Sequence, residues 1–416
     1  MNTLVKDRQY YKFSLYGFLK NLRFFDAFFI LFLVEKGLPY TQIGILYAVR
    51  EIVINVLEVP SGFVADAYGR KNALLGSFLA YIVSFALFYF SGNFNLFLMA
   101  FVFYGIGDAF RTGTHKAMIM DYLKIKRWED QKFDYYGHTR SWSQMGSAVS
   151  SLLAGVLVFY TGNYTNVFLY SIVPYLVNFG LILSYPRQLN YSSGHKSKIS
   201  HFNFTDTIKS FFRVIRYKSV IRIINTTSVH SAYLKAVKDY IQVLMVHVVA
   251  LVPLFATSEP GKKNGLFIGI IYFMIYLLTS NASAVSSRFS RKDKSNIAFV
   301  TLLIGFGLGT FSGVFYLADT RVLALIAFVG VFIIENIRKP ILTGYIADEV
   351  PNNILASVIS AQSLVQTIMT AVFAVVFGFL ADQFSIGVAL VTVSLALAAV
   401  SVLLKLTALP KVNSLF

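Results

Sequence analysis

The sequence predicts an all-α membrane protein with about twelve transmembrane helices arranged as two six-helix bundles. Three observations support this fold class. Of the 416 residues, 56% are hydrophobic and only 14% are charged, which is too apolar for an ordinary water-exposed surface. The apolar residues form long stretches, and at about 20 residues per bilayer crossing a chain of this length holds roughly twelve. Short polar loops separate these stretches, apart from one longer polar connector at 187–218.

The apolar stretches place the expected spans in order along the chain. Six precede the connector, at 13–35, 41–64, 72–91, 95–121, 139–160 and 165–185. Six follow it, at 220–250, 264–286, 296–317, 321–346, 355–380 and 385–406. The first residues are polar and basic and lack a small-residue cleavage site, so we expect the first helix to act as its own insertion signal.

The basic residues predict the orientation in the membrane. Most lysines and arginines lie in the loops on one side, and the expected opposite side holds only Lys36, Lys262, Lys263 and Arg321. Positive residues concentrate in cytoplasmic loops. We therefore expect a multi-pass protein of a cell membrane, a prokaryotic inner or plasma membrane, with both termini in the cytoplasm. This placement accounts for the net charge of +17 without nucleic acid as a partner.

The connector at 187–218 divides the chain into two expected domains. They are an N-terminal bundle at 1–186 and a C-terminal bundle at 219–416. The connector begins as a flexible stretch and continues as a basic amphipathic helix, which we expect on the inner membrane surface.

Two short matches between the halves indicate an internal duplication. At a shift of 227 positions, the triplet Asp108, Arg111 and Asp121 falls on Glu335, Arg338 and Asp348. At a shift of 221 positions, Arg70 and Lys71 fall on Arg291 and Lys292.

The loop after the second span carries the clearest motif. It reads GFVADAYGRK from Gly62 to Lys71. Gly62 permits close helix contact, Gly69 can adopt positive φ, and Arg70 holds the loop on the cytoplasmic side. This loop closely resembles the signature loop of the major facilitator superfamily. The resemblance implies a secondary active transporter whose two bundles alternately expose a central site.

The resemblance also implies a set of gating residues. In that family the loop latches the two halves on the cytoplasmic side, and the expected ionic partner of Arg70 is Asp121. The second copy departs from the pattern, with serine at the acidic and glycine positions. The gating candidates are Gly62, Asp66, Gly69, Arg70, Asp121, Arg291 and Asp348.

Many ionisable residues lie within the expected spans. Each costs roughly 2.5–3.5 kcal/mol near the bilayer centre, so such groups face a partner or a water-filled cavity. We single out nine bases, Lys20, Arg23, Arg50, Arg111, Lys116, Lys235, Lys238, Arg338 and Lys339. The six acids are Asp26, Glu51, Glu58, Asp108, Asp239 and Glu335. These residues lie in the first, second, fourth, seventh and tenth spans. All of these spans except the second correspond to helices that line the central cavity in the family. The excess of bases predicts a small anionic organic substrate, phosphorylated or not.

Site roles follow from this interpretation. The substrate-binding candidates are Arg23, Arg50, Arg111, Lys235, Lys238, Arg338, Tyr104 and Tyr240. Arg111 and Arg338 occupy equivalent places, from which they would clamp an anion bidentately. The proton-coupling candidates are Asp26, Glu51, Asp108, Asp239 and Glu335, because a buried carboxylate releases its proton when a base approaches.

Several alternatives remain open at the sequence level. The charged groups would serve only to hold helices together if they paired as Arg23 with Asp26, Arg111 with Asp108, and Arg338 with Glu335. A multidrug or amphipathic-compound efflux pump, a divalent-metal transporter and a receptor that binds without transport are the other functions considered. We expect no enzyme activity, no cofactor and no metal site, and a monomer with H⁺ as the coupling ion. The absence of cysteine excludes disulfides and thiolate metal sites.

Overall fold

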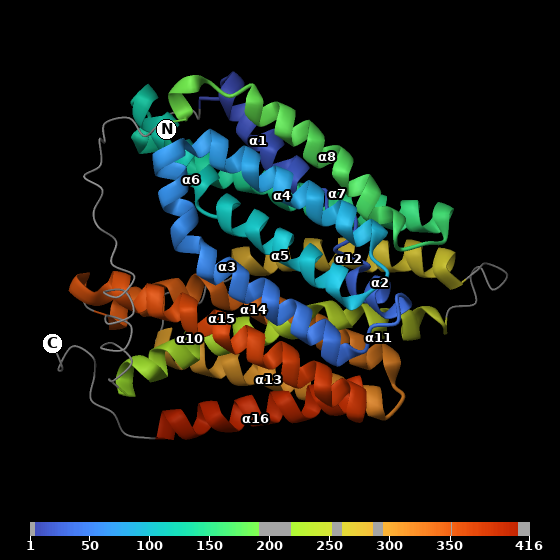
Figure 1. The fold of residues 1–416 in the computed structure, drawn as a ribbon. Helices are drawn as coiled ribbons and strands as arrows, with labels where there is room; N and C mark the ends of the chain where they lie inside the picture. The colour runs from blue at the N-terminus through green and yellow to red at the C-terminus, as the bar shows by residue number, and fades with distance from the viewer. Residues whose placement is uncertain (1–4, 191–217, 252–259, 286–293, 351, 407–416) are drawn as a thin grey trace. The chain divides into compact units, whose positions relative to one another are not determined.

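The computed structural model describes residues 5–190, 218–251, 260–285, 294–350 and 352–406. All regular elements in these ranges are helices (Figure 1). Nine of the predicted spans form one helix each: α3 (Tyr40–Tyr68), α4 (Arg70–Phe90), α7 (Lys132–Thr161), α8 (Asn166–Leu183), α12 (Pro260–Val285), α13 (Lys294–Leu317), α14 (Arg321–Glu349), α15 (Asn352–Gln383) and α16 (Ile386–Leu406). The prediction of about twelve spans is confirmed. The predicted amphipathic connector lies outside the described residues, except for a 3-10 turn, η2 (Arg187–Leu189).

Three spans expected as continuous helices are interrupted. The first consists of α1 (Arg8–Lys20) and α2 (Phe29–Glu35), and the fourth of α5 (Phe94–Arg111) and α6 (Thr114–Lys126). The seventh consists of α10 (Lys218–Val237), a 3-10 turn η3 (Lys238–Tyr240) and α11 (Ile241–Val249). A further 3-10 turn, η1 (Glu129–Gln131), precedes α7.

These interruptions also explain which helices look membrane-spanning by composition. Within the described ranges, eight helices are both long and apolar enough to cross a bilayer. The first and seventh spans are absent from that set, the first because its helices are too short, whereas the interrupted fourth span is included as the single stretch Phe94–Lys126. Helices α3 and α14 are each 29 residues long, which is enough to cross a bilayer, but charged residues in their interiors exclude them from the set. Mid-span charge thus weakens the apolar signal in the helices where function is expected.

The chain separates into two compact units that do not follow its order. One contains Met1–Gly37, Val49–Lys198 and Pro253–Tyr276, and the other contains Leu38–Ala48, Ile199–Val252 and Leu277–Phe416. Thus the start of α3 packs with the second unit, and most of α12 packs with the first. The division into sequence halves at 1–186 and 219–416 stays a prediction.

Within the second unit, glycines bring α3 and α15 into backbone contact. A Cβ on Gly44 would lie 2.2 Å from the Ala374 carbonyl oxygen, and one on Gly378 would lie 2.3 Å from the Tyr40 carbonyl oxygen. Asp382 caps the start of α3, since its carboxylate accepts from the amides of Tyr40 at 2.8 Å and Thr41 at 2.7 Å. Neither glycine position can hold a larger residue without moving a helix.

Within the first unit, α7 and α12 make a similar contact. A Cβ on Gly155 would lie 2.8 Å from the Gly265 carbonyl oxygen, and one on Gly269 would lie 2.7 Å from the Ser151 carbonyl oxygen. Tyr164 follows the end of α7, and its hydroxyl accepts from Asn264 of α12 at 3.3 Å. Burial raises the pKa of Tyr164, so this hydroxyl stays protonated.

The signature loop adopts the geometry expected for Gly69 but not for Gly62. Gly69 has φ of 98° and forms the N-cap of α4, where a Cβ would lie 2.3 Å from the Asn190 side chain. Positive φ at Gly69 is therefore confirmed. Gly62 makes no close helix contact, because a Cβ there would meet no described atom within 4 Å.

Candidate functional site

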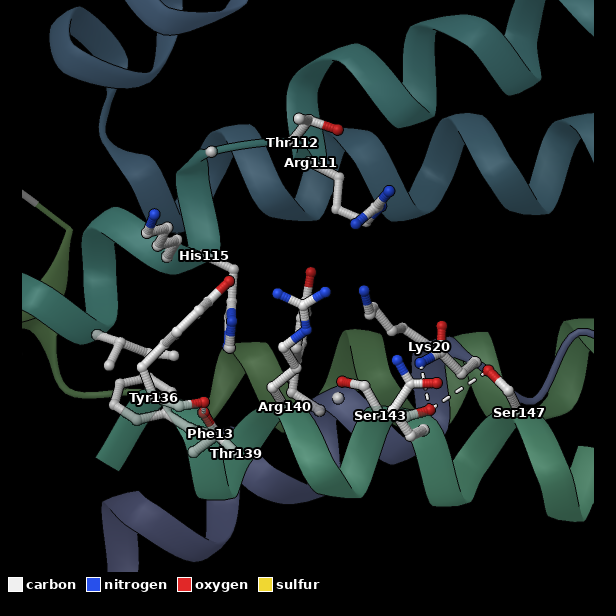
Figure 2. A pocket seen from close by; sticks show the side chains of 17 residues that line it. Phe13, Lys20, Arg111, Thr112, His115, Tyr136, Thr139, Arg140, Ser143 and Ser147 are labelled. Atoms are coloured by element: carbon white, nitrogen blue, oxygen red, sulfur yellow. Dashed lines mark hydrogen bonds between the residues drawn. The ribbon is translucent and has the colours of Figure 1, made fainter. Parts of the chain in front are cut away.

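A cavity of about 680 Å³ lies within the first unit and is bounded by α1, α6, α7 and the break before α6. We call it the cationic cavity. Its lining residues are Phe13, Tyr16, Gly17, Lys20, Asn21, Arg111, Thr112, Gly113, His115, Lys116, Ile119, Tyr136, Thr139, Arg140, Ser143, Gln144 and Ser147. Four of them are bases, and none of the described lining residues is acidic. Figure 2 shows the cationic ends of Lys20, Arg111 and Arg140 pointing into the cavity from different helices.

The break between α5 and α6 positions Arg111. Thr112 adopts an extended backbone and Gly113 has φ of 83°, a conformation that glycine adopts readily. Arg111 is the last residue of α5, so its guanidinium lies where the helix ends and the cavity begins. The N-terminus of α6, whose free amides favour negative charge, lines the same cavity.

A buried hydrogen-bond network orients Arg111. Its Nη2 donates to Asp108 Oδ1 at 2.6 Å and its Nε donates to the Tyr81 hydroxyl at 2.9 Å. Tyr81 in turn donates to Asp108 at 2.5 Å. The pairing of Arg111 with Asp108 that the sequence suggested is therefore present. One edge of the guanidinium, Nε and Nη2, is held by Tyr81 and Asp108, and the residue still lines the cavity.

The other three bases of the cationic cavity have no carboxylate partner. The side chains of Lys20 and Arg140 form no hydrogen bond or ion pair with any described residue, and Lys116 Nζ lies 5.4 Å from the centre of the Tyr136 ring. A cation over an aromatic face keeps its full charge. The cavity is therefore strongly electropositive.

Two aromatic side chains hold His115 at the wall of this cavity. The Tyr16 ring stacks on the imidazole with centroids 3.7 Å apart, and the Phe13 ring meets it edge-on at 5.3 Å. His115 Nε2 lies 3.4 Å from the Tyr185 hydroxyl. The stacked Tyr16 ring and the edge-on Phe13 ring together restrict the position of the imidazole.

Five predicted site residues gather in a second cluster of the first unit. Arg23 pairs with Asp26 at 2.9 Å and donates to the Tyr104 hydroxyl at 2.6 Å. Arg50 pairs with Glu51 at 3.0 Å, and its guanidinium lies 5.9 Å from the centre of the Tyr104 ring. The sequence-predicted pairing of Arg23 with Asp26 is confirmed. None of the five lines the cationic cavity.

The second unit has its own cavity, of about 740 Å³. It is lined by Thr227, Ser231, Leu234, Lys235, Lys238, Phe332, Glu335, Asn336, Lys339, Leu342, Ile346, Ile359, Gln362 and Gln366. Three lysines and one glutamate line it, together with amide and hydroxyl groups. Of the predicted site residues, Lys235, Lys238 and Glu335 thus share one cavity.

Glu335 and Arg338 do not form the pair that their spacing suggested. Glu335 accepts from Ser231 at 2.5 Å and lies 2.8 Å from His230 Nδ1. Arg338 is 0% exposed. It donates to the carbonyls of Ala298 at 2.5 Å and Thr226 at 2.7 Å. Its guanidinium joins α14 to α13 and α10 and is absent from the cavity lining, so a substrate contact by Arg338 stays a prediction.

The remaining two candidates of the second unit are buried around η3. Asp239 accepts from the Tyr47 hydroxyl at 3.0 Å and lies 3.7 Å from Lys238 Nζ. Tyr240 is 0% exposed, and its ring packs on Tyr40 and Phe377. Tyr240 does not line the described cavity of its unit.

The gating candidates of the first half form an ionic cluster. Arg70 forms an ion pair with Asp121, as the sequence predicts, and lies 3.4 Å from Asp66 Oδ1. Arg291 falls outside the described residues. So does the side chain of Asp348, although its backbone belongs to α14. The gating role of the whole set stays a prediction.

Sequence reasoning missed Arg140, which lies one residue inside the predicted fifth span. The signal available was its spacing, because Arg140, Ser143 and Ser147 follow i, i+3 and i+7 and so share one face of a helix. Lys20 and Lys116 were recognised as bases but not as members of one site. Their convergence depends on the packing of α1, α6 and α7. No group of three or more potential metal ligands occurs in the part of the chain that the structure describes.

These features define a polytopic helical membrane protein with polar cavities inside its helical units, the architecture of a solute transporter. The family model of the Major Facilitator Superfamily matches residues 21–374. The chain belongs to this superfamily. A curated relative, described as an uncharacterized MFS-type transporter, YxaM of Bacillus subtilis (strain 168), is 23% identical over 374 residues. The match covers 90% of this chain and 89% of that protein.

Solved structures share the fold. The crystal structure of the nucleoside transporter NupG has a TM-score of 0.74 at 13% identity, covering 96% of this chain and 97% of that one. A POT family transporter in complex with 5-aminolevulinic acid has a TM-score of 0.72 at 12% identity, covering 96% and 95%. A D-xylose-proton symporter has a TM-score of 0.66 at 12% identity, covering 97% and 98%.

Proposed function

We propose that this major facilitator transporter moves a small organic anion by alternating access. The observation that carries the proposal is the cationic cavity, where Lys20, Arg111, Lys116 and Arg140 line one space with no acidic residue among its described lining. Charged groups within membrane spans are costly unless a counterion or water accompanies them. A bound anion supplies the missing negative charge.

The chain's own residues have distinct roles in this proposal. Arg111 is held by Asp108 and Tyr81, so its guanidinium is oriented before the solute arrives. Lys20 and Arg140 approach from α1 and α7 and neutralise the solute directly. The free amides at the start of α6 add a favourable dipole.

We also propose proton coupling through Glu335. It lines the cavity of the second unit and contacts His230 and Ser231, so a proton arriving from that cavity would be shared between the carboxylate and the imidazole. Proton movement linked to solute movement would make the protein a secondary active transporter. Of the structural neighbours, one is titled a proton symporter, which is in keeping with this energy source.

The moving parts and their surroundings complete the proposal. The rocking bodies are the sequence halves at 1–186 and 219–416, and the ion pair of Arg70 with Asp121 belongs to the cytoplasmic latch. The protein lies in a prokaryotic inner or plasma membrane with both termini in the cytoplasm, and it acts as a monomer.

Uptake into sealed proteoliposomes tests the proposal. Radiolabelled organic anions, cations and neutral metabolites are screened, and we expect accumulation of anions only. Arg111→Ala should abolish that accumulation, because it removes the oriented guanidinium. Lys124→Gln, an exposed base at the end of α6 that is absent from the cavity lining, serves as the matched control.

Each alternative function has its own signature in this assay. Accumulation of amphipathic cations would indicate efflux of drugs, and accumulation of divalent cations would indicate metal transport. Binding of label without accumulation would indicate a receptor. Uptake that persists after collapse of the pH gradient would exclude proton coupling but leave the anionic substrate in place.

A further inference from the structure

The four bases of the cationic cavity are neutralised to different extents. Arg111 is paired with Asp108 at 2.6 Å. Lys116 rests on an aromatic ring, which does not cancel its charge. Lys20 and Arg140 have no ionic partner among the described residues. A solute bound here therefore meets three bases without an ionic partner among the described residues, and a solute with two negative charges would pair with more of them than a solute with one.

The rest of the lining is rich in hydrogen-bonding groups. Thr112, Thr139, Ser143, Ser147, Asn21 and Gln144 surround the same space. Asn21 Nδ2 donates to the Ser143 carbonyl at 2.6 Å, which fixes the amide and leaves its oxygen as an acceptor. Such a wall suits a hydrophilic solute whose oxygen atoms accept and whose hydroxyl groups donate.

We infer that the transported solute carries two negative charges on a small hydrophilic body. Two sources share this chemistry, a phosphate monoester and a dicarboxylate. The inference rests on the proposed function, since it names the charge of the solute in the same cavity. Arg111 binds one anionic oxygen pair, and Lys20 and Arg140 neutralise the second charge from the other two helices.

Matched probe pairs test the charge of the solute. Methyl phosphate and methyl sulfate have nearly the same shape, but at pH 7.5 the phosphate ester is mostly doubly charged, because its second pKa is about 6. Succinate and its monoamide, succinamate, form the second pair. Binding to the purified full chain is measured by calorimetry and by thermal stabilisation.

We expect the dissociation constant of the dianion to be at least tenfold lower than that of the monoanion in at least one pair. A preference within the phosphate pair alone would identify a phosphate monoester, and a preference within the succinate pair alone would identify a dicarboxylate. Equal binding of both members in both pairs would overturn the inference.

Variants connect the preference to the unpaired bases. Arg140→Gln and Lys20→Gln should each reduce the preference to about threefold or less, whereas Arg140→Lys and the control Lys124→Gln should retain it. The conservative Arg140→Lys variant shows whether the position tolerates substitution. An unchanged preference in folded Arg140→Gln and Lys20→Gln would contradict the inference.

The two proposals fail in distinguishable ways. If monoanions and dianions bind equally well, the solute is still an anion and only its charge is wrong. If neutral or cationic solutes are accumulated while all four probes leave the protein unaffected, the proposed function itself fails.

Discussion

Arg338 illustrates how burial changes the expected role of a charged residue. Its guanidinium is enclosed between helices and its hydrogen bonds go to the carbonyls of Ala298 and Thr226. Arg111, at the equivalent place in the first half, lines a cavity instead. Two residues at matching positions of the predicted repeat therefore have different surroundings.

Arg338→Ala should lower stability without a solute present. The change removes a large buried side chain and its hydrogen bonds, and we expect a loss of roughly 2–5 kcal/mol. Thermal unfolding of the purified protein in detergent measures it. Arg111→Ala should also lower the unfolding midpoint, because it leaves Asp108 without its ionic partner, but it alone should abolish the stabilisation given by anions. Stability unchanged by Arg338→Ala would mean that the side chain is not enclosed as described.

A glycine in α13 holds the imidazole that contacts Glu335. A Cβ on Gly305 would lie 2.1 Å from His230 Nε2, so alanine there must displace the ring and disturb its contact with Glu335. Gly305→Ala should reduce proton-driven uptake tenfold or more while leaving solute exchange at equal pH largely intact. Gly307→Ala is the matched control, because no described atom lies within 4 Å of its Cβ. Equal effects of the two substitutions would disprove this role of the glycine.

At the scale of helices, the start of α3 depends on a carboxylate from α15. Asp382 accepts from the amides of Tyr40 and Thr41, which otherwise lack partners at a helix N-terminus. Asp382→Ala should cost about 1 kcal/mol, the usual loss for an N-terminal cap. Thermal unfolding checks this value, with the exposed neighbour Gln383→Ala as control. If Asp382→Ala lowers stability no more than Gln383→Ala does, the cap contributes nothing.

The interrupted helices mark the limit of prediction from sequence. Apolar stretches located the spans to within a few residues, because bilayer thickness fixes their length. They did not reveal that the fourth span stops at Thr112 and restarts at Thr114, since Gly113 is one of many glycines in apolar spans. Pro340 occupies the matching position in α14, and that helix continues without a break. Whether a helix bends or breaks there depends on its neighbours.

The same limit applies to the candidate site. Spacing predicted the pair of Arg23 with Asp26, which lie three residues apart between α1 and α2, and the family resemblance predicted the pair of Arg70 with Asp121. Spacing did not predict that Lys20 and Arg140 line the same cavity, because α1 and α7 are far apart in sequence. It also suggested a pair of Glu335 with Arg338, which His230 and the Ala298 carbonyl replace. Contacts set by tertiary packing leave little trace in one sequence.

For the whole molecule, the absence of cysteine offers a direct test of the cavity during transport. Ser147→Cys places one thiol in the lining of the cationic cavity. We expect a membrane-impermeant maleimide to label it from one side of the membrane at a time, with the accessible side changing when the gradient is reversed. A transported anion should slow the labelling at least fivefold. Labelling that is indifferent to both gradient and anion would contradict alternating access through this cavity.

The glycine contacts between α3 and α15 and between α7 and α12 also determine how the chain tolerates change. Gly44, Gly155, Gly269 and Gly378 have carbonyl oxygens where a methyl group would lie, whereas Gly62, Gly76 and Gly180 have open space. A saturation library selected for transport should therefore divide glycines that resemble one another in sequence into two groups. The first group should accept no other residue, and the second should vary freely. The tolerated substitutions alone would then identify the glycines at which helices are in contact.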